Sequence, residues 1–355
     1  FNAVVIIATY VLAPYTENPA RAMSIGVILG GCIQALFQWP FIRQTGWKIC
    51  FTSLKKTFSN PGTKKVIALI VPTILGMAAY QLNDLVSTSL ATRTGEGIAS
   101  SLQYSLRLQE LILGIFAVSI GTVILPDLSG LANEEKWEDF NSMLVQAIKI
   151  MILISIPVTF FSFVNGKEMI TLLYKSKSFD DNSVMLTLGE FRFHIAGLLF
   201  IALNRIISPA FYAQRNTKLP TMAGIISFIA NIILALVLVI FMKGNGIALA
   251  LSLASLVNTI FLFIFMKKMN TFETKKIIKN SLIYMVKIII LSVVAAVPCY
   301  LLNPIWISAF GNYGKIISQG LPIFINFLIF ATIGVLGLIV TKDDIAVTII
   351  KKIKR

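Results

Sequence analysis

The chain has 355 residues, of which 56% are hydrophobic and 13% are charged, and its formal net charge is +15. A soluble domain would have roughly 25% charged residues, so this composition excludes a soluble globular protein. A mean hydropathy of +0.82 indicates an all-α, polytopic bundle of transmembrane helices.

Ten apolar segments are long enough, or nearly long enough, to cross a bilayer as helices. They lie at residues 1–14, 20–42, 66–91, 98–126, 141–164, 184–213, 219–242, 246–266, 281–302 and 317–341. The first is too short to span if it starts at Phe1, so we expect that the chain begins within a helix.

Basic residues gather in loops that fall on one side of this ten-span arrangement. Residues 43–65 contain six Lys or Arg and no acid, 267–280 contain five Lys and one Glu, and the tail ends in KKIKR. Cytoplasmic loops carry an excess of Lys and Arg, so we expect these segments and the C-terminus in the cytoplasm, beside anionic membrane lipids. The acidic loop 127–139 should share that side, because acids contribute little to orientation. This location of the charge also argues against nucleic-acid binding.

Residue patterns typical of enzymes and metal clusters are missing from the sequence. It has no Ser-His-Asp set, no glycine-rich phosphate loop and no paired-carboxylate motif. Cys32, Cys50 and Cys299 lack CxxC spacing, and the one histidine, His194, has no ligand partner in sequence. We therefore expect no catalytic residues, no enzyme activity and no cofactor, and a structural role for these four side chains.

Two opposite charges lie within the predicted span 98–126. Arg107 and Glu110 are three residues apart and therefore share one helix face. A charge at the bilayer centre costs about 2.5 to 3.5 kcal/mol, so such residues face a bundle interior or a water-filled cavity. Two interpretations remain open: a salt bridge that fixes helix packing, or an arginine that faces a cavity and binds an anion such as phosphate.

Other predicted spans also carry polar residues. The segment YQLNDLVSTSLAT contains Asn83, Asp84 and Ser87. Arg205 lies within 184–213, where it either faces a cavity or extends toward the basic turn that follows. Single asparagines in apolar runs favour hydrogen bonds between helices; these are Asn204, Asn231 and Asn258.

Small residues predict close helix packing. Gly26, Gly30 and Gly31 form a GxxxG-type face in the span 20–42. Prolines interrupt four other spans and favour kinks, which the movable helices of a transporter also need.

The stretch QYSLRLQELILGIFAVSIGTVILPDLS, residues 103–129, resembles the signature region of the MurJ (MviN) family of lipid II flippases, in the multidrug/oligosaccharidyl-lipid/polysaccharide exporter superfamily. The matching positions are Tyr104, Arg107, Leu108, Glu110, Gly114, Thr122, Leu125, Pro126, Leu128 and Ser129. The segments LLYKSKSFD and SPAFYAQRNTKLP also resemble the family. The chain departs from the family pattern at Ile112, where members usually have proline.

The resemblance implies a two-lobed transporter fold with fourteen helices, of which this chain would hold the last ten. Residues 1–42 would complete the N-terminal lobe, and 43–65 would form a basic cytoplasmic linker. Residues 66–267 would form the six-helix C-terminal lobe, and 268–355 two additional helices with a basic tail.

The resemblance also implies a function. The protein would flip lipid II, a precursor of peptidoglycan, from the cytoplasmic to the periplasmic leaflet of the bacterial inner membrane by alternating access, for cell-wall synthesis. The implied substrate-binding residues are Arg107, Glu110, Arg205, Asp84 and Asn83. The family implies coupling to the membrane potential or to a cation, with a cation site at Asp84, Ser87 and Asn231, where Ser87 stands at the position of the usual acid.

The implied partners are lipid II, membrane lipids and other cell-wall synthesis proteins. Two alternatives to lipid II transport remain open. One is an exporter of another polyprenyl-linked glycan or of a drug, and the other is a membrane scaffold that does not transport.

Overall fold

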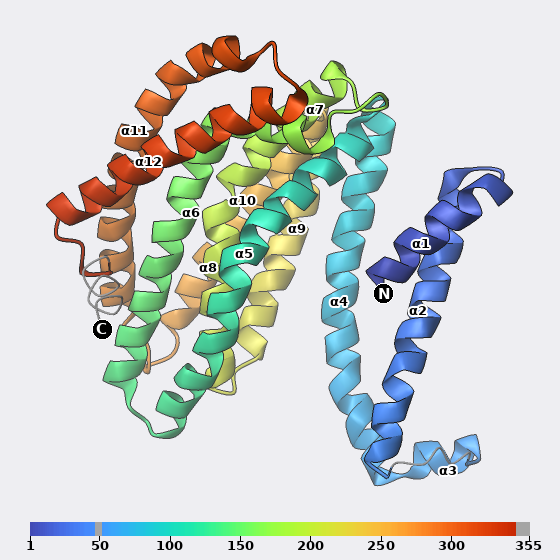
Figure 1. The fold of residues 1–355 in the computed structure, drawn as a ribbon. Helices are drawn as coiled ribbons and strands as arrows, with labels where there is room; N and C mark the ends of the chain where they lie inside the picture. Colours follow the sequence, from blue (N-terminus) through green and yellow to red (C-terminus); the bar gives the residue numbers. More distant parts are fainter. Residues whose placement is uncertain (47–51, 346–355) are drawn as a thin grey trace. The chain divides into compact units, whose positions relative to one another are not determined.

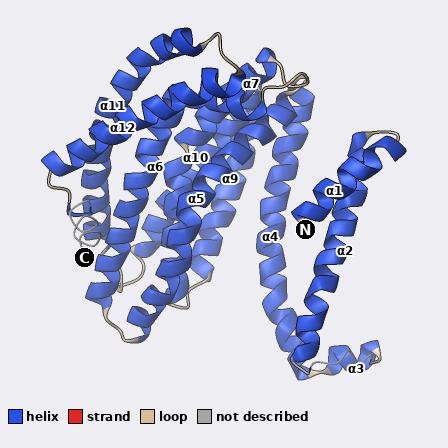
Figure 2. Ribbon diagram, viewed as in Figure 1, coloured by secondary structure: helices blue, strands red, loops and turns tan. Residues whose placement is uncertain are grey.

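The computed structural model describes residues 1–46 and 52–345, and every regular element in this part of the chain is a helix (Figures 1 and 2). Lys48 and the tail KKIKR, which the sequence places in basic cytoplasmic segments, lie outside the described residues. The chain divides into two units, Phe1–Pro72 and Thr73–Arg355. Their boundary falls within α4 (Pro61–Thr94). The boundaries of lobes, linker and tail drawn from the sequence stay predictions.

The first unit is built on a close helix pair. It contains α1 (Asn2–Leu12), the 3-10 helix η1 (Ala13–Tyr15), α2 (Pro19–Gln44), α3 (Leu54–Ser59) and the start of α4. A stripe of small residues on α2, at Ala22, Gly26 and Gly30, is buried. A Cβ at Gly30 would lie 3.0 Å from the Val5 side chain, so glycine permits the close approach of α1. The predicted glycine face is thus confirmed at Gly26 and Gly30, whereas Gly31 faces open space.

The second unit contains the end of α4 and the remaining helices. These are α5 (Ile98–Asn133), α6 (Trp137–Tyr174), α7 (Asp181–Ala196), α8 (Leu198–Ala213), α9 (Lys218–Met242), α10 (Gly244–Met266), α11 (Thr274–Phe310), the π-helix η2 (Ile316–Gly320) and α12 (Leu321–Val340). Helices lie at all ten segments predicted to span the membrane.

The core of the second unit lies between α5, α6, α7, α8 and α11 (Figure 1). One residue from each of these helices, Leu108, Ile148, Phe191, Ile206 and Ile277, is at most 1% exposed. Because side chains that face lipid are apolar as well, contact with neighbouring helices, rather than hydropathy, distinguishes this core.

The segment predicted as one span at 184–213 is broken into α7 and α8, which meet at Gly197 with a bend of 41°. The bend leaves backbone carbonyls near the end of α7 accessible to side chains. Ser252 of α10 donates to the Phe193 carbonyl at 2.6 Å, and Gln109 of α5 donates to the His194 carbonyl. Thr159 of α6 donates to the carbonyl of Ile195 at 3.3 Å. Three helices therefore satisfy the backbone at the bend, as a break inside a membrane requires.

The last two long helices, α11 and α12, pack against each other and against α6 (Figure 1). Ala295 and Cys299 of α11 and Phe330 of α12 form a separate apolar cluster, in which Phe330 contacts the ring of Phe161 at a centroid distance of 5.7 Å. The last two long helices thus form a pair that packs against α6; that this pair is additional to a transporter lobe stays a prediction.

Length and hydropathy support a membrane location. Among the described residues, six helices are long and apolar enough to cross a bilayer, and the bent α7–α8 pair makes a seventh. Helix α1 is shorter, as the segment 1–14 predicted. The all-α polytopic bundle expected from composition is confirmed.

Candidate functional site

A polar cavity of about 530 Å³ lies in the second unit between α8, α9 and α10, with one side chain from α4 at its border. Its larger polar side chains are Asn83, Asn204, Arg205, Tyr212, Asn231 and Asn258. Polar groups inside a membrane bundle mark substrate or ion sites more often than lipid contacts. This cavity is therefore the first candidate for a binding site.

Arg205 brings a positive charge to the cavity wall. It is exposed and lies two turns before the end of α8. Among the described residues it takes part in no ion pair that would neutralise its guanidinium. Of the two interpretations drawn from the sequence, the structure thus shows Arg205 in a cavity wall, with its five donors available to an anion.

Two asparagines of the cavity connect helices. Asn204 donates to the Ser255 carbonyl at 3.0 Å and accepts from the Thr259 hydroxyl at 2.8 Å, which joins α8 to α10. Asn231 donates to Asn83 Oδ1 at 2.5 Å, which joins α9 to α4. The predicted interhelical hydrogen bonds are confirmed for both. The Oδ1 atoms of Asn231 and Asn258 are buried and have no protein partner, so they can accept hydrogen bonds from a ligand.

A second, smaller cavity of about 50 Å³ adjoins the first, because Asn83 and Leu251 line both. Asp84 and Ser87 of α4, Gln103 of α5 and His194 of α7 complete its polar wall. Gln103 donates to Asp84 Oδ1 at 3.3 Å. The structure therefore brings Asn83, Asp84 and Ser87 to one cavity, as their shared predicted span allowed.

The residues of the implied cation site are only partly brought together. Asp84 and Ser87 line the smaller cavity, whereas Asn231 lines the larger one and bonds to Asn83 instead. Within the residues that the structure describes, no group of three or more His, Cys, Asp and Glu residues could hold a metal ion.

Arg107 and Glu110 form the ion pair that their spacing predicted, with Nη1 of Arg107 2.9 Å from Oε2 of Glu110. Their side chains are 71% and 37% exposed, and neither lines the two polar cavities. The pair joins adjacent turns of α5 and does not link α5 to another helix. An exposed pair of this kind contributes about 0 to 1 kcal/mol to stability.

His194 is buried and shares a hydrogen bond of 2.7 Å between its Nδ1 and the Ser105 hydroxyl. This contact agrees with the structural role expected for it. It belongs to a polar contact between α5 and α7, in which Gln109 donates to the His194 carbonyl. The sequence offered no indication of this pairing, because the two helices are 85 or more residues apart in the chain at these contacts.

Two buried acids within the helices were missed in the sequence. Glu168 of α6 is 3% exposed and Glu190 of α7 is 2% exposed. Glu190 lies inside the predicted span 184–213, so its charge was a usable signal. Glu168 lies just beyond the predicted span 141–164, but α6 continues to Tyr174 and carries it into the bundle.

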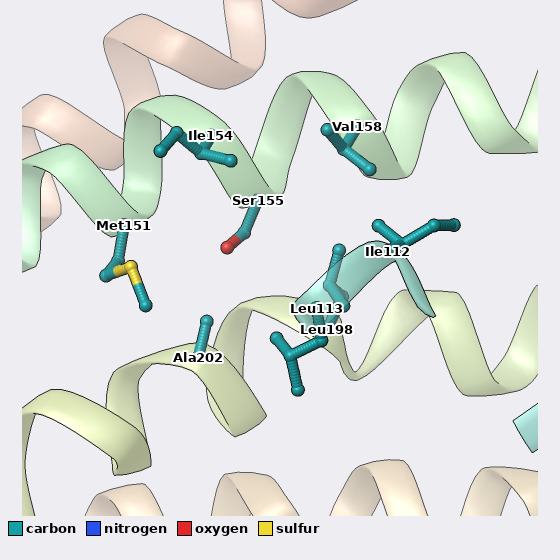
Figure 3. Close-up of a pocket in the computed structure, with 8 residues that line it drawn as sticks. All are labelled: Ile112, Leu113, Met151, Ile154, Ser155, Val158, Leu198 and Ala202. Atoms are coloured by element: carbon teal, nitrogen blue, oxygen red, sulfur yellow. The ribbon is translucent and has the colours of Figure 1, made fainter. Parts of the chain in front are cut away.

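An apolar pocket of only about 10 Å³ lies between α5, α6 and α8. Figure 3 shows the side chains around it, including Ile112, Leu113, Met151 and Ala202, with the Ser155 hydroxyl as the one oxygen among the side chains drawn. A single water needs about 10 to 15 Å³, so this space holds no substrate. It is a packing gap beside Ile112, and α5 passes this position as a continuous helix.

Comparisons with known proteins agree with these features. The family model described as lipid II flippase MurJ matches residues 1–314. The chain is 45% identical over 354 residues to a probable lipid II flippase MurJ of Treponema pallidum, which covers 100% of this chain and 67% of that protein. A probable lipid II flippase MurJ of Vibrio cholerae is 31% identical over 262 residues, covering 74% of this chain and 49% of the relative.

Solved structures give the same result. A lipid II flippase MurJ in an inward closed conformation matches with a TM-score of 0.73 and 27% identity, over 97% of this chain and 66% of that one. A Vibrio cholerae MATE transporter matches with a TM-score of 0.52 at 16% identity, which shows a shared fold alone; the match covers 78% of this chain and 63% of that one. The chain thus spans about two thirds of the first relative and about half of the second. With a matching family model over most of its length, this chain belongs to the lipid II flippase MurJ family.

Proposed function

We propose that the protein flips lipid II from the cytoplasmic to the periplasmic leaflet by alternating access, to supply cell-wall synthesis. Family members are transporters rather than enzymes. The observation that supports this function most directly is Arg107, an exposed arginine in the family's signature helix whose ion pair with Glu110 occupies only part of its guanidinium. Lipid II carries a diphosphate, and planar arginine donors match phosphate oxygens.

The pair with Glu110 has a physical role in this proposal. An arginine loses side-chain conformational freedom when it binds a substrate, and this loss weakens binding. The Glu110 carboxylate, one turn away, already restricts Arg107, so less freedom remains to be lost. One of its nitrogens is engaged by Glu110, while a side chain that is 71% exposed leaves the others accessible. Arg107 would neutralise diphosphate charge, and Glu110 would hold the arginine in position.

The polar cavity supplies a second set of contacts. Arg205 would attract the anionic headgroup, while the unpartnered oxygens of Asn231 and Asn258 would accept hydrogen bonds from sugar hydroxyls or peptide amides. Asn83 and Asp84 extend this polar wall. A headgroup this polar cannot cross hydrocarbon without such partners.

Location and orientation follow from the family and from the charged loops. The protein is a multi-pass protein of the bacterial inner membrane. We place its C-terminus in the cytoplasm, because the loop 267–280 is basic. A protease-cleavable tag at the C-terminus should be cut only from the cytoplasmic side; cutting from outside would reverse this topology.

The functional test uses the complete gene in cells depleted of their own lipid II flippase. We expect the wild type to restore exposure of labelled lipid II at the outer face, and Arg107→Ala at equal abundance to reduce it at least tenfold. Lys136→Ala, which breaks an equally exposed ion pair with Glu134 in a loop, is the matched control and should leave exposure unchanged.

Other outcomes would support different functions. If the wild type restores nothing, the cargo is another polyprenyl-linked glycan or a drug, or the protein is a scaffold. If Arg107→Ala restores exposure as well as the wild type does, the Arg107–Glu110 pair serves α5 alone. If Arg107→Ala is lost from the membrane, this supports the other interpretation, a salt bridge that fixes helix packing.

A further inference from the structure

We propose a binding site for one monovalent cation between α6, α11 and α12, away from the polar cavities and independent of the proposed flipping. Its ligands are the side-chain oxygens of Glu168 and Asn165 of α6, Asn303 of α11 and Asn326 of α12. These four residues are called the amide–carboxylate cluster below.

The cluster is one connected group of hydrogen bonds. Asn326 donates to Asn165 Oδ1 at 2.7 Å and to Asn303 Oδ1 at 2.9 Å, and Asn303 donates to Glu168 Oε1 at 3.2 Å. Asn165 and Glu168 are three residues apart and share a face of α6. Asn303 of α11 therefore connects Glu168 of α6 to Asn326 of α12.

Two oxygens of this group have no donor. Oε2 of Glu168 and Oδ1 of Asn326 are buried without a hydrogen-bond partner, in residues that are 3% and 0% exposed. Both amide hydrogens of Asn326 are already used, by Asn165 and Asn303. A buried acceptor without a partner costs about 1 to 3 kcal/mol. The cluster thus lacks a donor or a cation at two buried oxygens.

Charge and ligand type indicate which species completes the cluster. Glu168 has no ion-pair partner in the part of the chain that the structure describes, so no basic side chain there would balance a carboxylate at this position. All the available ligand atoms are oxygens, which hard cations prefer. A monovalent ion would neutralise one carboxylate, whereas a divalent ion would leave a net positive charge among apolar helices.

A network that serves only helix packing would have a different pattern. Such networks are stabilising when every member is satisfied, and an incomplete one is worse than apolar packing. Trp306 Nε1, one turn from Asn303, is a buried donor without a partner, but it can serve only one of the two acceptors. The Ser162 hydroxyl, on the same α6 stripe as Asn165 and Glu168, is also unpartnered and adds a further oxygen.

The position of the cluster indicates its access. Glu168 lies near the end of α6 opposite to the loop 127–139, and Asn326 lies near the start of α12. With the topology given above, this end faces the periplasm. Ions from that side would join the C-terminal helix pair to α6.

The test measures binding of radioactive ²²Na⁺ to the purified full-length protein, with N-methyl-D-glucamine as the replacement cation. We expect Glu168→Gln to bind one Na⁺ fewer per chain than the wild type, and Asn326→Leu to lower the affinity of this site at least tenfold. Glu138→Gln, an exposed acid on the same helix, is the matched control. Asp84→Asn tests whether the ion is held at the polar cavity instead. When Glu168→Gln is added to Asp84→Asn, the double variant should still bind one Na⁺ fewer per chain than Asp84→Asn alone.

Equal Na⁺ binding by the wild type and a folded Glu168→Gln variant overturns the proposal, and a water then satisfies the cluster. A second measurement needs no variant. In the wild type, replacing Na⁺ by N-methyl-D-glucamine should accelerate amide hydrogen exchange in residues 162–170 and 321–328 and leave residues 98–105 unchanged. Identical exchange rates in both cations would also reject the site.

Discussion

At the scale of single residues, the bend between α7 and α8 depends on side chains from other helices. The Ser252 hydroxyl bonds to the Phe193 carbonyl at 2.6 Å, and Ser252 is 5% exposed. Inside a membrane bundle, a backbone carbonyl at a helix break needs a protein donor, and the serine hydroxyl supplies it here. Gly197 complements it, since a Cβ there would overlap the Ser252 side chain.

Ser252→Ala should therefore lower the free energy of unfolding by about 1 to 3 kcal/mol, because it leaves a buried carbonyl unpaired. Thermal unfolding of the purified protein in detergent measures the change. Ser100→Ala, an exposed serine near the start of α5, should stay within about 0.5 kcal/mol of the wild type. Equal stability of the two variants would show that another group satisfies the Phe193 carbonyl.

At the scale of helices, the start of α7 shows how a loop determines where a broken span begins. Asp180 follows the short turn closed by the Ser176–Phe179 bridge. Its carboxylate accepts from the backbone N–H of Ser183 at 2.8 Å, as an N-cap does. Hydrogen bonds from Ser183 hold the pKa of Asp180 below its ordinary value of 3.8.

Asp180→Ala should lower the unfolding temperature at pH 7, because the first turn of α7 loses its cap. Asp180→Asn should retain most of the stability, since an amide oxygen still accepts from Ser183. The pKa of Asp180 is lower in the folded state than its ordinary value of 3.8, so its carboxylate stabilises the fold above pH 3.8. This stabilisation is lost as the pH falls through the folded-state pKa of Asp180. Unfolding temperatures from pH 7 to pH 3 test this; a gap between wild type and Asp180→Ala that persists in acid would contradict it.

At the scale of the whole molecule, polar contacts hold α11 and α12 to α6 at one end and to each other at the other. At one end lies the amide–carboxylate cluster. At the other, Lys287 of α11 forms an ion pair of 2.7 Å with Asp343, which follows α12, and Tyr284 donates to the same carboxylate at 3.3 Å. We therefore expect the pair to move with α6 during alternating access.

Flipping would need an energy source, and Asp84 is an acid in the wall of the smaller cavity. We propose that Asp84 and Ser87, with Asn231 across the adjoining cavity, couple flipping to Na⁺ or to the membrane potential. Replacing external Na⁺ by choline should reduce lipid II exposure at least tenfold in the wild type, and Asp84→Asn should abolish this dependence. Asp139→Asn, an exposed acid at the start of α6, is the control. Exposure that is identical in Na⁺ and choline would reject the coupling to Na⁺.

The sequence by itself determined the class, the helix positions and the family. A bilayer admits only apolar segments whose backbone is hydrogen-bonded internally, so hydropathy locates the helices without further information. The ion pair of Arg107 and Glu110 also followed from the sequence, because residues three apart on a helix are neighbours.

Only the tertiary structure decided which polar residues meet. Asn83 and Asn231 are 148 residues apart, and Asn165 and Asn326 are 161 apart, yet each pair shares a hydrogen bond. Such contacts depend on the rotation of each helix about its axis. In a membrane both lipid and helix interfaces are apolar, so hydropathy does not encode that rotation, and packing alone sets it.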